Sequence, residues 1–250
     1  MCGITGWLAF PNAATLPTQR QLLAMVRTMT HRGPDDEGVY VALDQRLGLA
    51  VRRLSIIDVA GGHQPLSNED DTLWVVLNGE IYNYRALQTE LEQAGHRFRS
   101  RSDTEVLVHL YEARGLEGLK DLRGMFAFAL WDGRTRRLLL VRDRLGVKPL
   151  YYTLTNGALL FASEIRALLA HPEVSRAVDP NSVAHYLTFS AVPSPGTMFQ
   201  DIRKLPPGHF LLATPEGQVR CAPYWEPVSA STDRLTLEEA TERLRALLEE

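Results

Sequence analysis

The sequence of 250 residues lacks most features of exported, membrane-spanning and nucleic-acid-binding proteins. Its two cysteines, Cys2 and Cys221, form no CxxC pair and are too few for a disulfide framework, so we expect free thiols in a reducing compartment. No signal-peptide layout opens the chain, and the longest apolar run, Met125 to Trp131, is too short to cross a bilayer. The net charge is -3, without a dense Lys/Arg block. We expect a cytoplasmic protein with no nucleic-acid or membrane partner.

Metal and phosphate motifs are also absent from the sequence. The seven histidines show no HxxxH or HExxH spacing, and Gly61-Gly62 lacks the strand-to-helix setting of a phosphate loop. We therefore predict no metal site in this chain. What is present is ordinary globular composition, 45% hydrophobic and 23% charged, which allows a sizeable core.

Short apolar or alternating segments, separated by turn residues, dominate the first four-fifths of the chain and predict strands. Breaks such as Asp132-Gly133 and Asn156-Gly157 are typical of hairpins, which favours antiparallel pairing. The predicted strands are 3–10, 39–43, 47–51, 73–77, 126–131, 138–141, 150–154, 159–161 and 209–212, the last of which opens a strand pair that ends near Tyr224-Trp225.

Helices are interspersed in blocks between these strands. Thr18 with Gln21, and Ser102 with Glu105, form capping boxes, and Asn83 is expected to cap a third helix. Two further helices are predicted at 164–169 and 180–189. Antiparallel strands with helices in blocks indicate an α+β fold in which packed sheets are covered by helices.

The C-terminal part changes character. Residues 226–235 read as a polar linker, and Thr236 with Glu239 then forms a capping box that opens an apolar-striped helix over 236–250. Because this stripe has no stop signal before Glu250, we expect a fragment of a longer protein that ends inside its next domain.

Cys2 directly follows the initiator Met1 and precedes Gly3. Removal of Met1 would expose an α-amine on the residue that carries the thiol. The reference pKa values of a thiol (about 8.5) and an α-amine (about 8) are both close to neutral pH. The amine can therefore act as general base for its own side chain, as an N-terminal threonine does. The alternative is an unprocessed Met1 before a small residue of the first strand, and Cys2 alone does not decide between them.

Seven short segments make the nucleophile the stronger reading. Together they resemble the class II glutamine amidotransferases, and their order and spacing are similar to the glutaminase half of glutamine-hydrolysing asparagine synthetases. The residues of the second and third segments differ from those of relatives that make glucosamine phosphate or phosphoribosylamine. The segments are Cys2–Gly6, His31–Asp35, Arg53–Asp58, Asn78–Asn83, Ser102–Glu105, Gly124–Phe128 and Arg142–Leu150.

The resemblance implies the N-terminal-nucleophile hydrolase fold, an αββα sandwich of two antiparallel sheets between helical layers. It implies a glutamine amidotransferase (glutaminase) domain over 2–225, the linker 226–235, and at 236–250 the first helix of a truncated synthetase domain. In this family the thiol attacks the glutamine amide, ammonia leaves, and water frees glutamate from a γ-glutamyl thioester. Cys2 would be that thiol.

The remaining site residues are carried over by the same resemblance. Asn78 and Gly79 match the family's oxyanion donors, although Asn-Gly is also a common turn dipeptide. Arg53 matches the ligand of the glutamine α-carboxylate, and Asp103 and Glu80 match the partners of its ammonium group. We expect the helix N-terminus at Ser102 to help keep Asp103 ionised.

Four further residues, which would line the glutamine pocket mainly through their backbone, are Leu54, Ser55, Ile56 and Ile57. A loop containing Arg32 and Gly33 is expected to cover the substrate. We interpret Arg142–Pro149 as a structural charged turn that braces the sheets, and Cys221 as a semi-buried apolar residue.

The family's second domain adenylates aspartate with ATP, and its Ser-Gly-Gly-x-Asp-Ser motif is absent here. The resemblance thus implies a glutaminase that supplies ammonia for asparagine synthesis by a synthetase domain acting in cis or in trans. No cofactor is expected in this chain; ATP and Mg belong to that missing domain. Three alternatives stay open: a non-catalytic glutamine-binding module, an amidotransferase that feeds a different carboxylate, and a hydrolase of another amide. Homodimerisation also stays open.

Overall fold

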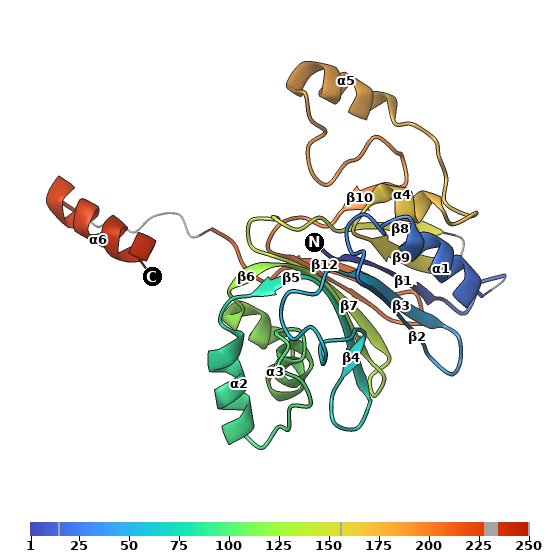
Figure 1. The fold of residues 1–250 in the computed structure, drawn as a ribbon. Coiled ribbons are helices and arrows are strands. Elements are labelled where there is room, and N and C mark those ends of the chain that lie inside the picture. The colour runs from blue at the N-terminus through green and yellow to red at the C-terminus, as the bar shows by residue number, and fades with distance from the viewer. Residues whose placement is uncertain (15, 156, 228–234, 250) are drawn as a thin grey trace.

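The computed structural model describes residues 1–14, 16–155, 157–227 and 235–249. Within them the strands form two antiparallel six-stranded sheets that lie face to face (Figure 1). The first sheet has the order β10 (Ile202–Lys204), β8 (Tyr151–Thr155), β9 (Ala158–Ala162), β1 (Gly3–Ala9), β3 (Leu47–Arg53), β2 (Asp36–Val41). The second has the order β12 (Val219–Pro223), β11 (His209–Ala213), β7 (Arg137–Arg142), β6 (Gly124–Asp132), β5 (Leu73–Ile81), β4 (Leu66–Ser67).

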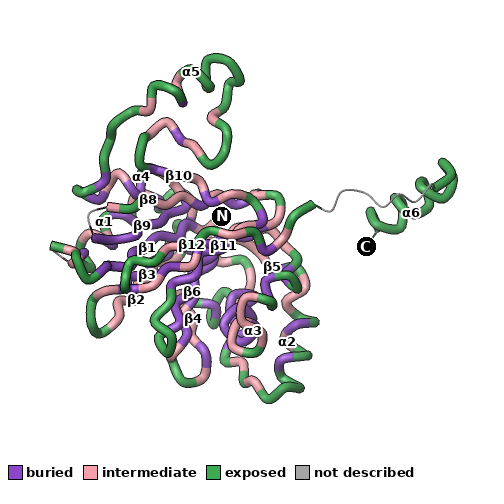
Figure 2. Tube along the Cα trace, turned by 180° about the vertical axis from the view of Figure 1, so that it is seen from behind, coloured by how far each residue is buried: buried purple, intermediate pink, exposed green. Residues whose placement is uncertain are grey.

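Helices cover the outer face of each sheet (Figure 1). The first sheet carries α1 (Gln19–Arg27) and α4 (Ile165–Leu169), and the second carries α2 (Tyr84–Gln93), α3 (Val106–Arg114) and the 3-10 helix η1 (Gly115–Asp121). Two more helices, α5 (Pro180–Phe189) and α6 (Leu237–Glu249), bury almost none of their side chains (Figure 2).

Three apolar clusters correspond to the three interfaces between these four layers. Alternate residues of one strand enter different clusters because successive side chains point to opposite faces of a sheet. On β1, Leu8 packs between the sheets while Trp7 packs under α1; on β6, Ala127 packs between the sheets while Phe128 packs under the helices. Strands covered on both faces read as nearly continuous apolar runs, as these do. The αββα sandwich is confirmed.

Each predicted strand overlaps an observed one, and the Thr18–Gln21 capping box is present. The sequence missed two strands of two and three residues, β4 and β10, and the 3-10 turn η1. The expected Asn83 cap is wrong in detail: α2 begins there, but the Asn83 side chain bonds the backbone of Asp121 and Arg123. The predicted linker lies mostly outside the described residues, since 228–234 are not described.

The layering brings the ends of three strands together. Gly3 pairs with Arg52, so the residue before β1 lies beside the end of β3. In the other sheet, Asn78 and Gly79 lie inside β5, opposite Ala127 and Phe126 of β6. The Asn-Gly pair is therefore not a turn; it is part of a central strand that faces the start of β1.

Candidate active site

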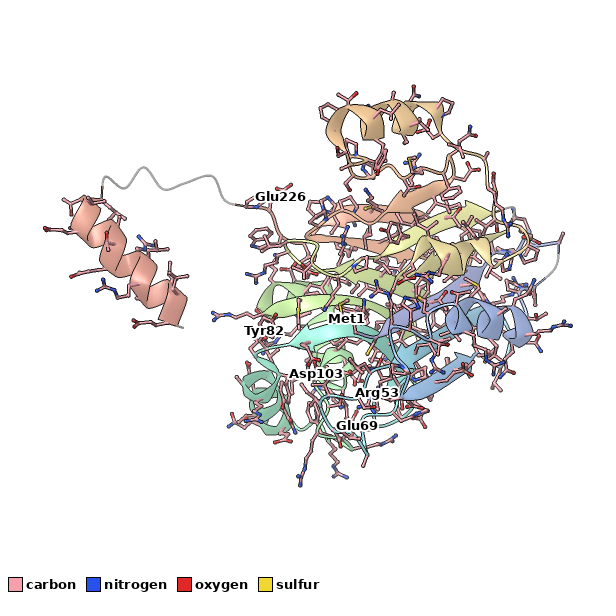
Figure 3. The ribbon with its side chains drawn as sticks, turned by 45° about the horizontal axis from the view of Figure 1, so that its top comes forward. Met1, Arg53, Glu69, Tyr82, Asp103 and Glu226 are labelled. Atoms are coloured by element: carbon pink, nitrogen blue, oxygen red, sulfur yellow. The ribbon has the colours of Figure 1, made fainter. Side chains whose placement is uncertain are left out.

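One cavity contains most of the residues that the sequence singled out. It lies between the end of β3, the start of β1, β5 and the segment that leads into α3, and Figure 3 labels Met1, Arg53 and Asp103 around it. The residues that line it are Cys2, Arg53, Leu54, Ile56, Ile57, Gln64, Gly79, Glu80, Ser102, Asp103 and Thr104.

Cys2 is half-buried at the edge of this cavity. Its Sγ lies 3.8 Å from the carbonyl oxygen of Leu54, a weak hydrogen-bond contact. Burial raises the pKa of the Cys2 thiol, opposed by that contact and by the positive charges of the chain's N-terminal amine and Arg53. Among the described residues that line the cavity there is no histidine, so no imidazole stands ready as base for the thiol.

Gly79 has a backbone that only glycine fits. Its φ is +151°, and a Cβ at this position would lie 2.1 Å from the carbonyl oxygen of Met125. The neighbouring Asn78 is fully buried, and neither its amide nitrogen nor its amide oxygen has a hydrogen-bond partner among the described residues. Asn78 is not among the residues that line the cavity, although Gly79, the next residue, is. A buried amide left unpaired is unfavourable, so a polar ligand would stabilise it.

Arg53 is 4% exposed and holds the loop that follows β3. Its guanidinium donates to the carbonyl oxygens of Ile57 and Asp58, both at 2.8 Å, and of Val59 at 3.3 Å. A guanidinium has five N–H donors, so within the described residues two remain for a ligand. Arg53 lines the cavity, and its role as the ligand of the glutamine α-carboxylate stays a prediction.

Two carboxyl groups, Asp103 and Glu80, face the same cavity. Asp103 accepts a hydrogen bond from the N–H of Ile81 at 2.9 Å. Burial raises the pKa of Asp103, and that bond opposes the rise. Burial, together with the nearby charge of Asp103, raises the pKa of Glu80 to about 6, while Lys148 opposes the rise. Two neighbouring acids that burial makes costly to ionise form a site for a cation.

The expected helix start at Ser102 is wrong. The helix α3 begins at Val106, and the Glu105 carboxylate does not cap it but accepts from the N–H groups of Arg99 and Ser100, both at 2.7 Å. Asp103 therefore lies in a turn before the helix. The effect of burial on the pKa of Asp103 is opposed first by the hydrogen bond from Ile81, and then by the backbone N–H groups of Asp103 and Thr104 and the Ser102 side chain.

The predicted pocket segment after β3 is a loop. Leu54, Ile56 and Ile57 line the cavity, although Ile56 is 63% exposed. Ser55 is not among the lining residues; its N–H donates to the Asp35 carboxylate at 2.9 Å. Three of the four residues therefore lie at the cavity, and their backbone contacts to a ligand stay a prediction.

The loop with Arg32 and Gly33 lies against β3 instead of lining the cavity. Arg32 forms an ion pair with Glu164, and the Gly33 carbonyl accepts from Arg52 at 2.8 Å. A Cβ on Gly33 would lie 2.3 Å from the carbonyl carbon of Arg52. The structure does not bring these residues to the cavity, and their role as a cover stays a prediction.

Gln64 and Asp58 are the residues that sequence reasoning missed. Gln64, 4% exposed, donates to the Thr104 hydroxyl at 3.0 Å and accepts from the Leu77 N–H at 2.7 Å. Asp58 accepts from the Arg101 N–H at 2.8 Å and so joins the Arg53 loop to the segment before α3. Both contacts span many residues in sequence, and no local motif indicates them.

Two interpretations of other residues can be compared with the structure. Arg142–Pro149 braces the sheets as expected: Arg142 donates to the carbonyl oxygens of Lys148, Leu205 and Gly146, each at 2.8 Å. Cys221, expected to be semi-buried, is an exposed free thiol on β12, an edge strand.

The four-layer sandwich of two antiparallel sheets has the N-terminal-nucleophile hydrolase fold, and a cysteine precedes its first strand. The chain belongs to the glutamine amidotransferase domain family, whose sequence profile matches residues 1–225. It is 40% identical to the glutamine-hydrolyzing asparagine synthetase 1 of Bacillus subtilis, over 95% of this chain and 38% of that protein. It is also 34% identical to amidase chry2 of Gibberella zeae, over 99% of this chain and 38% of that protein.

A solved structure of similar fold is the glutamine phosphoribosylpyrophosphate amidotransferase of B. subtilis. It has a TM-score of 0.64 at 20% identity and covers 92% of this chain and 50% of that chain, a likeness of fold alone. The chain thus spans well under half the length of the curated relatives named above. Among its described helices, none has the length and apolar character to cross a membrane.

Proposed function

We propose that this domain hydrolyses glutamine to glutamate and ammonia, with Cys2 as the nucleophile after Met1 is removed. The observation that carries the proposal is that one cavity is lined by all of these groups. They are the thiol of Cys2, the backbone of Gly79, the buried guanidinium of Arg53, and the carboxyl groups of Glu80 and Asp103. Each of these groups has a counterpart on glutamine, and together they cover both ends of that molecule.

The amino-acid end of glutamine is bound by charge. The two free N–H groups of Arg53 donate to its α-carboxylate, and Asp103 with Glu80 binds its α-ammonium. An ammonium group would lower the pKa values of Asp103 and Glu80 that burial has raised. The bound ligand would therefore stabilise both carboxyl groups in their ionised form. This arrangement selects a free amino acid over a simple amide.

The side-chain amide then lies at Cys2. The α-amine of Cys2 takes the thiol proton, and Sγ attacks the amide carbon of glutamine. The resulting oxyanion accepts hydrogen bonds from the Asn78 side-chain amide and the Gly79 N–H. When the C–N bond breaks, the amine returns its proton to the leaving nitrogen and ammonia departs. Water attacks the thioester by the reverse sequence and releases glutamate and the thiol.

The fate of the ammonia follows from the relatives. Similarity to glutamine-hydrolyzing asparagine synthetases supports delivery to an ATP-dependent synthetase domain that makes asparagine from aspartate. ATP and Mg would act in that domain, encoded in cis or supplied in trans. A different carboxylate acceptor stays an alternative, and similarity to amidase chry2 keeps hydrolysis of another amide as a further one.

The test combines intact mass with glutamate release from the purified chain. We expect Met1 to be absent, and we expect Cys2→Ala to lower the rate by at least about 10⁴-fold. The matched control is Cys221→Ala, since Cys221 is the other free thiol and lies on an exposed edge strand. If the processed wild type binds glutamine but releases no glutamate, the domain is a glutamine-binding module instead.

A further inference from the structure

A second group of reactive side chains lies outside the glutamine cavity. It is formed by the turn between β4 and β5, the loop between α2 and α3, and α3 itself. Within the described residues, two histidines and two glutamates each place one ligand atom within 4.8 Å of the others. These residues are Glu69 (labelled in Figure 3), His96, His109 and Glu112.

His109 is the observation that points to a ligand. Its side chain is fully buried, and neither ring nitrogen makes a hydrogen bond of acceptable geometry to a described residue. The nearest polar atoms are carboxylate oxygens, Glu69 Oε2 at 3.4 Å from Nδ1 and Glu105 Oε1 at 3.5 Å from Nε2. A buried imidazole without aligned partners is unfavourable unless something else occupies the space between.

The spacing of the ligand atoms suits a small tetrahedral ion. Zinc ligands at 2.0–2.2 Å from the metal lie about 3.3–3.6 Å from one another. His109 Nδ1 is 3.4 Å from Glu69, while His96 Nδ1 is 3.7 Å from Glu69 Oε1 and 4.0 Å from Glu112 Oε2. Small movements of side chains that are 16–34% exposed would close these distances, and the same exposure gives an ion a way in.

Outer partners already orient the ligands. Glu105 faces the ring nitrogen of His109 that is turned away from the cluster, the arrangement of a carboxylate–histidine–metal triad. The Glu112 carboxylate accepts from Arg134 at 2.7 Å and from Asn68 at 3.2 Å. Glu69 accepts from the Arg97 N–H at 2.8 Å. Ligating carboxylates are commonly fixed by such hydrogen bonds.

We propose that these four side chains bind one zinc ion. Two imidazoles with two carboxylates suit zinc, whereas magnesium and calcium prefer oxygen ligands alone. The ion would join three segments that are otherwise held by loops, one of which leads into Asp103. The histidine spacing in the sequence did not indicate this site, because its ligands come from three separate segments.

The experiment measures zinc on the full chain, as wild type and as Cys2→Ala, after dialysis against a zinc-containing buffer and then against buffer alone. The Cys2→Ala form is needed because an N-terminal cysteine can itself bind zinc. We expect a stoichiometric amount of retained zinc in both forms. A melting temperature about 5 °C or more above that of the EDTA-treated chain is expected when free zinc exceeds Kd a hundredfold. Cobalt in place of zinc should give the visible absorption of a tetrahedral site.

His96→Ala and Glu112→Gln test the ligands, since both positions are partly exposed and tolerate the change. Each should lose the retained zinc and the thermal shift. The control is His63→Ala, which removes another histidine paired with a carboxylate, Asp36 at 2.6 Å, and should change neither. Retention of zinc by both ligand variants, absence of zinc from the wild type, or its loss in Cys2→Ala would each overturn the proposal and leave a metal-free ion-pair network.

Discussion

Two regions of this molecule are built around an arginine with similar hydrogen bonds, but only one of them borders the glutamine cavity. Arg53 at the end of β3 and Arg142 at the end of β7 each donate three hydrogen bonds to loop carbonyls. Each has a buried aspartate nearby in space or sequence, Asp103 and Asp143. Asp143 accepts four backbone N–H groups, whereas Asp103 faces a cavity beside a second acid.

The difference lies in what remains unsatisfied. Around Arg142 the turn closes on itself, and the carboxylate of its aspartate, Asp143, accepts four backbone N–H groups of the protein. Around Arg53 the cavity borders Glu80 and adjoins Asn78, whose buried amide has no partner among the described residues. Buried charge alone therefore does not mark a functional site; buried polar groups that need a ligand do.

The first prediction compares the effects of replacing each of the two arginines by alanine. Arg142→Ala should lower the free energy of unfolding by about 3–5 kcal/mol, because three buried charged hydrogen bonds are lost, and leave the KM for glutamine unchanged. Arg53→Ala also loses three hydrogen bonds and should lower stability as well, but it should in addition raise that KM by about 10²–10³-fold through loss of the carboxylate ligand. Urea denaturation and glutaminase kinetics measure both. If the folded Arg142→Ala variant had a raised KM for glutamine, the distinction between a ligand-binding Arg53 and a structural Arg142 would be wrong.

The second prediction compares two buried asparagines. Asn78→Ala should lower kcat by about 10²–10³-fold and change stability by no more than about 1 kcal/mol, because its amide is unpaired in the free protein. Asn68 instead accepts from the N–H groups of Thr72 and Leu73, each at 3.0 Å. Asn68→Ala should therefore cost about 2–3 kcal/mol of stability and spare kcat. The reverse pattern would remove Asn78 from the oxyanion site.

The third prediction concerns pH. Since the pKa of Glu80 is raised to about 6, its carboxylate is lost as the pH falls through that value. Glutamine affinity should then fall by about tenfold between pH 7 and pH 5, the change in ionised fraction of one such group. Calorimetric titration of glutamine into the Cys2→Ala chain measures this without turnover. Glu80→Gln should bind weakly at both pH values, and an unchanged pH dependence in that variant would assign it to Asp103.

Much of this architecture was predictable from the sequence, for a physical reason. Strand periodicity is a property of the local sequence. Strands that are buried on both faces appear as nearly continuous apolar runs, which can be recognised without knowing the rest of the fold. The cap at Thr18 was also predictable, because both of its partners lie within one helical turn. The cysteine and the strand residues of the site were carried by a resemblance of motifs.

The predictions that failed depend on contacts that reach beyond one helical turn, some of them between distant segments. Glu105 matched a capping box, but the backbone of Arg99 and Ser100 occupies its carboxylate, so the helix begins later. Gln64 reaches Leu77 and Thr104, and neither contact leaves a mark in the local sequence. The hydrogen-bond partners of these polar side chains are determined by how the sheets pack, and local sequence patterns carry no information about that packing.

The smallest expected effect is on stability, and it again separates the cavity from the rest of the fold. The folded-state pKa of Glu80 lies above its ordinary 4.5, so the stability associated with this group is fully present below pH 4.5 and is lost as the pH rises through about 6. Glu80→Gln should therefore stabilise the protein at pH 8 by up to about 1 kcal/mol, discounted because Glu80 is partly exposed. The gain should disappear at pH 4.

The control for this last effect is Glu37, whose pKa is lowered by its hydrogen bond to Arg27. A lowered pKa means stability that is present above the ordinary value, so Glu37→Gln should destabilise the protein at pH 8. Urea denaturation of both variants at pH 8 and pH 4 measures the opposite signs. A loss of stability in Glu80→Gln at pH 8 would show that its carboxylate is satisfied within the protein, as that of Asp143 is, and would weaken its assignment to the ammonium site.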